Sequence, residues 1–152
     1  MIHQVKSNIF EVGRQSHFAH CISADAKMGA GIAVKFCEKF NLSPLRSAKL
    51  SVGDAKLFNG VFNLVTKEKF HHKPTIESVE LCLTNMREKC FDQGIKTVHM
   101  PRIASGLDKL PWWMVFEKIG DLFGNSMINI IIHNYSPRHR NLKRTKKYYD
   151  NS

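Results

Sequence analysis

Residues 19–33 read AHCISADAKMGAGIA: a short apolar run, then small residues and two glycines, then the first residues of an amphipathic segment. This order is typical of a buried strand that turns directly into a helix. Glycine lets backbone N–H groups approach an anion closely, and the N-terminal amides and dipole of a helix favour negative charge. We therefore select residues 29–32 as candidate phosphate-binding residues, with an ordinary strand-to-helix turn as the alternative.

The common nucleotide-binding motifs do not account for this turn. The third glycine of the dinucleotide fingerprint is missing after Gly29 and Gly31, and no Gly-Lys-Ser/Thr follows as in a P-loop. A second stretch, MPRIASGLDKL at residues 100–110, again places small residues directly after an apolar run. Two such loops have the chemistry to hold one diphosphate between them.

Elsewhere along the chain, segments with the apolar spacing of a strand alternate with segments that have the apolar spacing of a helix. Strands are predicted over Val5–Val12, Phe18–Ile22, Lys56–Phe58, Val61–Val65, Ile95–Met100 and Met127–His133. Helices are predicted from Gly31 to about Phe40, from Thr75 to about Cys90 and from Pro111 to Phe123. Asn59-Gly60 supplies the positive φ angles of a type I′ turn, so the two strands around it are expected to form an antiparallel hairpin at a sheet edge.

These elements predict an α/β fold with three layers, α/β/α. Two strand–helix–strand crossovers in succession imply a mixed, partly parallel central sheet covered by helices on both faces. Ligands of such sheets bind at the carboxyl ends of the strands. Both small-residue loops and the strand end at Thr66-Lys67 fall at such ends. We expect them to converge on one cleft.

Length and composition fit one ordinary globular domain. The chain has 152 residues and 17.4 kDa, with 43% hydrophobic and 24% charged residues. Because no leader pattern and no run of 18 apolar residues is present, we expect an intracellular protein, nuclear or cytoplasmic, without membrane contact. The four cysteines show no C-x-x-C spacing, so neither a disulfide framework nor a zinc site is expected. No metal or cofactor is predicted.

The net charge of +10 would attract polyanions, free nucleotides and phosphorylated ligands. Half of it is local, because residues 136–152 hold six basic residues and one acidic residue. After the break at Ser136-Pro137 this segment is predicted to be a basic, flexible C-terminal tail. A weak nucleic-acid contact and a nuclear-targeting patch at residues 143–147 are its functional interpretations, and a solvated tail is the alternative.

Four ordered motifs carry a resemblance to a known family. They are HCIS at residues 20–23 with MGAGIA at 28–33, VTK at 65–67, HKPT at 72–75, and MPRI at 100–103 with GLD at 106–108. Together they resemble the macro domains of the terminal ADP-ribose protein glycohydrolase subgroup. The resemblance runs from about Val5 to Tyr135, which predicts a macro domain over residues 1–135 and leaves 136–152 as the tail.

The resemblance implies a macro fold that binds ADP-ribose and releases single ADP-ribose units ester-linked to glutamate or aspartate side chains of proteins. Deacylation of O-acyl-ADP-ribose is implied as a second activity of the subgroup. The partners are then ADP-ribose and mono-ADP-ribosylated proteins, with no metal and no cofactor. A monomer is expected by default for a compact domain with a charged tail.

By this similarity, Lys67 corresponds to the catalytic nucleophile and Asp108 to the catalytic acid/base. The residues expected to line the ligand are Asn8, Ile9, Ile22, Ser23, Gly29, Ala30, Gly31, Ile32, Arg102, Ile103, Ala104, Ser105, Gly106, Leu107 and Tyr135. From chemistry alone, Lys67 is equally a solvated cation at a strand end, and Asp108 is favourable at the N-terminus of the next helix. One hypothesis is that the two side chains rest as an ion pair until substrate separates them. A nucleophilic Lys67 requires a neutral amine. If the strand continued to Lys69, that cation would lie on the same face and would favour the neutral form of Lys67.

The chain departs from the family at two places. Asn8 stands where an aspartate usually accepts a hydrogen bond from the adenine amino group, so we predict weaker adenine selectivity. Ala104-Ser105 replaces a Gly-Cys pair, which adds a Cβ where backbone approaches the diphosphate. Two other functions stay open: a reader domain that binds ADP-ribose without turnover, and a nucleic-acid-binding protein whose cleft is incidental.

Overall fold

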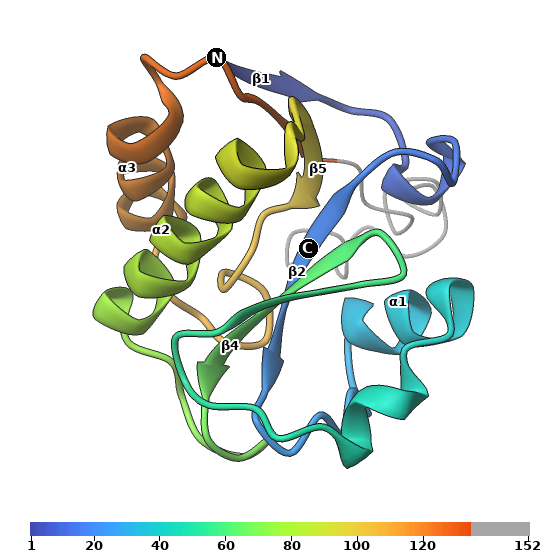
Figure 1. Ribbon diagram of the computed structural model, residues 1–152. Helices are drawn as coiled ribbons and strands as arrows, with labels where there is room; N and C mark the ends of the chain where they lie inside the picture. The colour runs from blue at the N-terminus through green and yellow to red at the C-terminus, as the bar shows by residue number, and fades with distance from the viewer. Residues whose placement is uncertain (135–152) are drawn as a thin grey trace, which may run out of the picture.

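The computed structural model describes residues 1–134, so Tyr135 and the predicted basic tail at 136–152 lie outside the described residues. One sheet of six strands runs through the molecule in the order β1-β6-β5-β2-β4-β3. The strands are β1 (Ile2–Val5), β2 (Phe18–Ser23), β3 (Ala55–Phe58), β4 (Val61–Lys67), β5 (Thr97–Pro101) and β6 (Asn129–His133). The helices are α1 (Ile32–Phe40), α2 (Ile76–Gln93) and α3 (Trp112–Phe123), with 3-10 turns η1 (Ile9–Glu11) and η2 (Ser43–Ser47) (Figure 1).

The sheet is mixed, as predicted. β1, β6, β5, β2 and β4 pair in parallel, and β3 alone pairs antiparallel, with β4, at the edge. The hairpin between β3 and β4 turns at Asn59 and Gly60, whose φ angles are 51° and 79°. This confirms the hairpin prediction, because a type I′ turn needs positive φ at both central residues.

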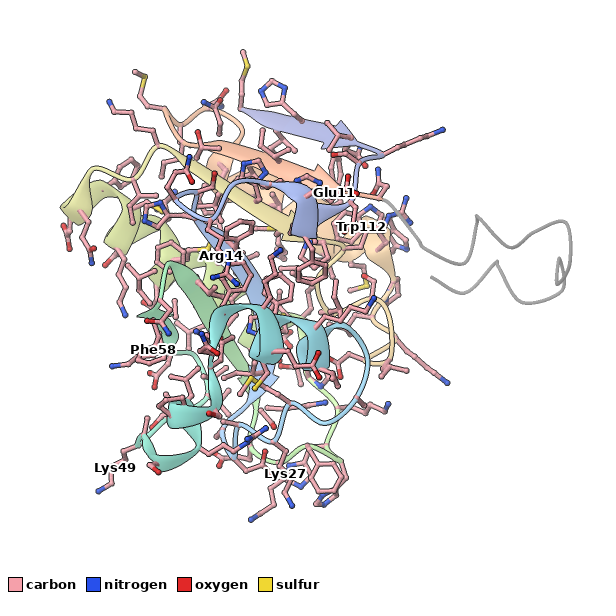
Figure 2. The ribbon with its side chains drawn as sticks, turned by 90° about the vertical axis from the view of Figure 1, so that its right-hand side faces the viewer. Glu11, Arg14, Lys27, Lys49, Phe58 and Trp112 are labelled. Carbon is pink, nitrogen blue, oxygen red and sulfur yellow. The ribbon has the colours of Figure 1, made fainter. Side chains whose placement is uncertain are left out.

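Helix α1 covers one face of the sheet (Figure 2). Its buried side chains Phe36 and Phe40 pack against Phe18 of β2 and against Val61 and Val65 of β4. The strand residues that face this layer alternate with those that face the opposite layer, as the period of two along a strand requires. This face forms a hydrophobic core of its own.

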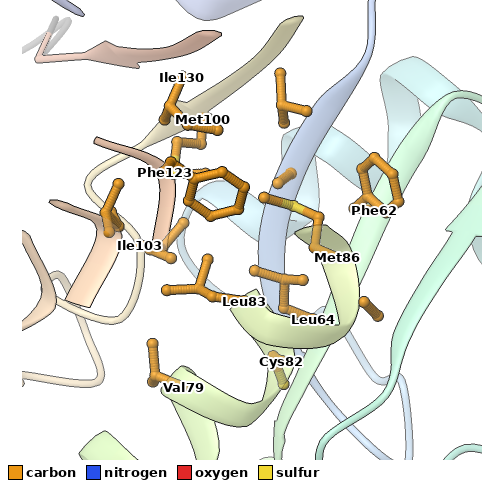
Figure 3. Packing of buried hydrophobic residues seen from close by; sticks show 14 of the residues in the cluster. Phe62, Leu64, Val79, Cys82, Leu83, Met86, Met100, Ile103, Phe123 and Ile130 are labelled. Carbon is orange, nitrogen blue, oxygen red and sulfur yellow. The ribbon is translucent and has the colours of Figure 1, made fainter. Parts of the chain in front are cut away.

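Helices α2 and α3 cover the opposite face, and Figure 3 shows the packing there. The predicted stripe along α2 is core, with Val79, Leu83, Met86 and Cys90 buried against Phe62 and Leu64 of β4. Thr75 caps this helix by accepting a hydrogen bond from the Ser78 amide, and Gly94 ends it in the left-handed region. Two covered faces confirm the predicted α/β/α arrangement.

The predicted strand over Val5–Val12 is wrong. β1 ends at Val5, and a 3-10 turn occupies Ile9–Glu11. The amide side chain of Asn8 causes this, because its Oδ1 accepts a hydrogen bond from the Phe10 amide at 3.0 Å and so begins the turn. The turn directs Ile9 into the core beside α1. Among residues 1–134, no helix has the length and apolar character that a membrane span needs.

Candidate active site

The site is assembled at the carboxyl ends of β2, β4 and β5. Three loops follow these strands: residues 24–31 lead into α1, residues 68–75 lead into α2, and residues 102–111 lead into α3. The arrowheads of β2 and β4 lie near one another at the lower end of Figure 1. Because β2 lies between β4 and β5 in the sheet, its loop is flanked by both of the others.

Lys67 and Asp108 form an ion pair at this end of the sheet. The Nζ atom of Lys67, the last residue of β4, donates a hydrogen bond to Oδ1 of Asp108 at 2.8 Å. The two side chains are only 15% and 18% exposed. A charge-assisted hydrogen bond that is largely shielded from water is stronger than an exposed one. Lys67 is therefore not the solvated strand-end cation that its position alone also allowed.

Asp108 does not cap a helix. α3 begins at Trp112, and its N-cap is Pro111, which makes no side-chain capping bond in the described structure. The prediction of Asp108 as a helix N-terminal residue is therefore wrong, because the carboxylate is turned toward Lys67. Lys69 also differs from the expectation: β4 ends at Lys67, so Lys69 lies in the following turn rather than on the strand.

Cys21, in β2 beside β4, lies close enough to Lys67 and Asp108 for their charges to affect its pKa. Burial raises the pKa of the Cys21 thiol well above its usual value. Cys82 and the carboxylate of Asp108 raise this pKa further, against the opposing effects of the Ala104 amide and Lys67. Cys21 is therefore held as a neutral thiol and supplies an uncharged neighbour to the ion pair rather than a nucleophile.

The loops after β2 and β4 are tied together by Asp25. One carboxylate oxygen accepts a hydrogen bond from the Ser23 hydroxyl, and the other accepts from the Phe70 amide at 3.2 Å. Backbone bonds add to this, since Ala24 N–H donates to the Lys67 carbonyl at 2.8 Å. Partial burial would raise the pKa of the Asp25 carboxyl, but the bonds from Ser23 and Phe70 and the nearby Lys27 hold it below its usual value. Asp25 was not among the predicted site residues, although its position two residues after Ser23 suits a turn that bonds backbone amides.

The loops after β2 and β5 meet as the sequence predicted. Leu107 lies over Gly31 so closely that a Cβ added to that glycine would sit 2.9 Å from the Leu107 Cδ1 atom. Gly31 also has a φ of 62°, which glycine adopts without strain. From the third loop, Lys73 Nζ donates a hydrogen bond to the Leu107 carbonyl at 3.2 Å. All three loops are thus in contact around the ion pair.

Backbone strain concentrates in the same loops. Six residues other than glycine have positive φ among residues 1–134, and four of them lie in the loops after β2 and β5: Ala26, Met28, Ala104 and Lys109. Open space surrounds the missing Cβ positions of Gly29 and Gly106. Strained backbone that persists in facing loops is typical of binding sites, where the surrounding fold holds it in place.

The candidate ligand-lining residues divide into two groups by exposure. The side chains of Ile9, Ile22, Ser23, Ile103 and Ala104 are buried. These residues can offer a ligand chiefly their backbone atoms. Residues 29–32, 106 and 107 are exposed at the loop surfaces.

The remaining candidates have contacts of their own. The Ser105 hydroxyl donates a hydrogen bond to the Ile103 carbonyl at 3.2 Å. The Arg102 guanidinium lies 5.4 Å from the Trp112 ring and bonds the Asn134 side chain at 2.9 Å. The side-chain oxygen of Asn8, Oδ1, already caps η1 by accepting from the Phe10 amide, which leaves it one further lone pair for a ligand. Tyr135 lies outside the described residues.

No three side chains of His, Cys, Asp or Glu gather as metal ligands within residues 1–134. The described part of the site instead offers an amine, a carboxylate and backbone amides. This donor set suits nucleophilic substitution with proton transfer, next to loops that can hold phosphate.

Comparison with known proteins identifies similar chains. The family model of the macro domain matches residues 21–119. Human ADP-ribose glycohydrolase OARD1 is 35% identical over 134 residues, which cover 85% of this chain and 88% of that protein. The macrodomain of Thermus aquaticus DarG is similar in structure, with a TM-score of 0.78, 20% identity, and coverage of 88% of this chain and 98% of that one. Thermosipho africanus DarTG, solved in complex with ADP-ribose, has a TM-score of 0.74 at 18% identity, covering 91% of this chain and 44% of that one.

Proposed function

The chain belongs to the macro domain family, and on this premise we propose that it hydrolyses the ester that joins one ADP-ribose unit to a glutamate or aspartate side chain of a protein. The name of the human relative, an ADP-ribose glycohydrolase, supports a hydrolase that acts on an ADP-ribose linkage. The bound ADP-ribose in Thermosipho africanus DarTG supports the same class of ligand. The choice of a carboxylate ester as the substrate rests on the motifs quoted above.

The Lys67–Asp108 ion pair is the observation that carries this proposal. The two residues come from different strand ends and meet where the three loops converge. In the pair Lys67 is an ammonium group, which has no lone pair for attack. Substrate entry must therefore separate the two groups, and the carboxylate of Asp108 is the base within reach of the Lys67 proton.

The reaction proceeds in two displacements. The neutral amine of Lys67 attacks the anomeric carbon of the distal ribose, a C–N bond forms, and the ester C–O bond breaks to release the protein carboxylate. Water then attacks the same carbon, the C–N bond breaks, and ADP-ribose leaves. Asp108 accepts the lysine proton and donates it to the leaving carboxylate, which restores the Asp108 carboxylate for the second step. There it accepts a proton from the attacking water and returns it to the departing Lys67 amine, so the ion pair forms again. One ester and one water give one ADP-ribose and one carboxylic acid.

The same groups would act on O-acyl-ADP-ribose, which is the second activity that we propose. A second candidate function, a reader that binds ADP-ribose without turnover, is favoured by the ion pair itself. If no substrate separates the pair, Lys67 stays an ammonium group and the site only binds. An intracellular location, a monomeric state and a nucleic-acid contact through residues 136–152 stay predictions.

Release of ADP-ribose from a protein mono-ADP-ribosylated on glutamate tests the proposal. The wild type is compared with Lys67→Ala, Lys67→Arg and Asp108→Ala, and binding of free ADP-ribose is measured for each. Lys67→Arg keeps the charge and removes the nucleophile. Lys118→Ala is the matched control, because it removes the cation of the partly exposed Lys118–Glu80 pair. Release by the wild type and the control, with binding but no release by the lysine variants, supports the hydrolase. Binding without release by the wild type makes the protein a reader.

A further inference from the structure

Next to Lys67 the chain presents an exposed aromatic and cationic surface that the reaction itself does not use. Phe70, three residues after Lys67, is 54% exposed although it belongs to a well-anchored turn. Its ring lies 5.2 Å from the His71 ring, which in turn lies 4.6 Å from the His72 ring. The ammonium group of Lys27, from the loop after β2, lies 4.8 Å from the centre of the Phe70 ring. We call Lys27 and residues 69–73 the rim surface.

Hydrogen bonds anchor the rim surface to the loops that surround the ion pair. The Phe70 amide donates to Asp25 at 3.2 Å, and the His72 amide donates to the Lys69 carbonyl at 3.0 Å. Lys73 bonds the Leu107 carbonyl on the facing loop. Figure 2 shows Lys27 at the lower end of the molecule, the end at which β2 and β4 finish in Figure 1. An aromatic ring on an anchored turn loses little conformational entropy when it binds a partner.

The charge of the rim surface is net positive, because its three lysines outnumber the two neighbouring carboxylates, Asp25 and Glu68. Lys27, Lys69 and Lys73 are exposed, and within residues 1–134 none of them forms a salt bridge. The Asp25 carboxylate accepts from the Ser23 hydroxyl and the Phe70 amide, which are neutral, so it keeps its charge and offsets part of that of Lys27. Such a surface attracts an anionic partner and excludes a basic one.

We propose that the rim surface binds the polypeptide of the substrate and favours acidic residues that flank the modified side chain. This rests on the proposed function. Only two methylene groups separate the backbone of a modified glutamate from its ester, so the substrate polypeptide passes close to Lys67. The rim surface begins two residues later in the chain. Phe70 packs on the apolar stems of the flanking side chains, while Lys27 and Lys69 pair with their carboxylates.

Binding measured in the Lys67→Ala background tests this without any need for turnover. Two peptides carry one ADP-ribosylated glutamate, flanked in one by glutamates and in the other by glutamines, and free ADP-ribose is the third ligand. We expect Phe70→Ala and the double variant Lys27→Gln/Lys69→Gln to weaken binding of the acidic peptide by about 5- to 10-fold. Free ADP-ribose should bind all variants within about twofold.

The controls are matched to the surface. Phe91→Ala removes a phenylalanine that is 56% exposed on α2, and Lys96→Gln removes an exposed lysine before β5. Both should leave every affinity unchanged. Equal binding of the two peptides, or equal weakening of free ADP-ribose and peptide by Phe70→Ala, would overturn the proposal. A single-stranded oligonucleotide with the same charge as the acidic peptide serves as a competitor. If it binds more strongly than the peptide, and Phe70→Ala abolishes that binding, the rim surface is assigned to nucleic acid and the proposal is overturned. If the protein releases no ADP-ribose in the turnover assay, the binding assay can still be carried out. Failure of the proposed function and failure of this inference are therefore distinguishable.

Discussion

The ammonium group of Lys67 and the carboxylate of Asp108 lie 2.8 Å apart, although 41 positions separate the two residues in the chain. One stands at the end of β4 and the other in the loop after β5. β2, the strand between them in the sheet, contributes Cys21, whose neutral thiol adds no charge to the pair. The pair is thus an ionic contact in partly buried surroundings, between residues from two different strand ends.

Substitution of Asp108 should impair turnover far more than binding. Asp108→Asn keeps the size and removes the base, so Lys67 has no group to accept its proton. We expect kcat for the ADP-ribosylated protein to fall by about 100-fold or more, with the affinity for ADP-ribose within a few-fold of the wild type. Glu80→Gln is the control, because it breaks the partly exposed Lys118–Glu80 contact of 3.6 Å. It should leave kcat unchanged and alter stability by less than about 0.5 kcal/mol.

A rise in KM with an unchanged kcat in Asp108→Asn would contradict this role. It would mean that Asp108 binds substrate uniformly rather than moving a proton in the reaction.

Asn8→Asp should tighten ADP-ribose binding. The aspartate can still cap η1, since the cap needs only an oxygen that accepts from the Phe10 amide. The new charge would strengthen a bond from the adenine amino group by about 1 kcal/mol, which is about fivefold in affinity. Titration of ADP-ribose and of its inosine analogue, which lacks the amino group, measures the change in selectivity. An affinity gain shared by both ligands would show that Asn8 does not face the adenine amino group.

Ala104→Gly should relieve strain in the loop after β5. Ala104 has a φ of 60°, in the left-handed region that glycine adopts without a steric cost. The left-handed conformation costs an alanine about 1–2 kcal/mol, and the greater freedom of glycine in the unfolded chain offsets part of that. We expect the free energy of unfolding to rise by up to about 1 kcal/mol in urea titrations. Ala33→Gly, in the first turn of α1, is the matched control and should lower it by roughly 0.5–1 kcal/mol. Equal losses in both variants would show that Ala104 is not strained.

Much of the fold was predictable because it depends on local patterns. Asn59-Gly60 predicts the hairpin from the φ angles that its turn needs, and the apolar stripe of α2 predicts its buried face. The two crossovers then leave few topologies for the sheet. The strand predicted over Val5–Val12 is wrong because one hydrogen bond, which the Asn8 side chain accepts from the Phe10 amide, outweighs a weak strand pattern.

The site was predictable only in part. Motif resemblance selected Lys67 and Asp108, and the ion pair between them is present, but their catalytic roles stay a prediction. Chemistry alone placed Asp108 at a helix N-terminus, because nothing in its neighbourhood along the chain reveals a lysine 41 positions away. The hydrogen bond from the Phe70 amide to Asp25 was not predictable for the same reason, because it joins two loops that are distant in sequence.

A buried histidine makes stability depend on pH. His20 is fully buried in β2, stacked on Phe36 with ring centres 4.4 Å apart, and its Nε2 atom lies 2.6 Å from Asn63 Oδ1. The Asn63 amide nitrogen donates to the Lys56 and Val61 carbonyls. Its oxygen therefore faces His20, and Nε2 must carry the donated proton. Within residues 1–134, Nδ1 has no partner.

The protein should lose stability as the pH falls below about 6.5, and His20→Gln should reduce that loss. Burial lowers the pKa of His20 to about 4, despite the hydrogen bond that its Nε2 donates to Asn63, whereas the unfolded chain takes up the proton near 6.5. Between pH 7.5 and pH 5 the free energy of unfolding should therefore fall by about 2 kcal/mol on account of His20. Burial also lowers the pKa values of His99 and His133, which contribute in the same direction. In His20→Gln the amide keeps a donor for Asn63 and does not titrate. Urea titrations at both pH values should show a loss about 2 kcal/mol smaller in this variant, and an equal loss in both proteins would mean that His20 is protonated in the folded state.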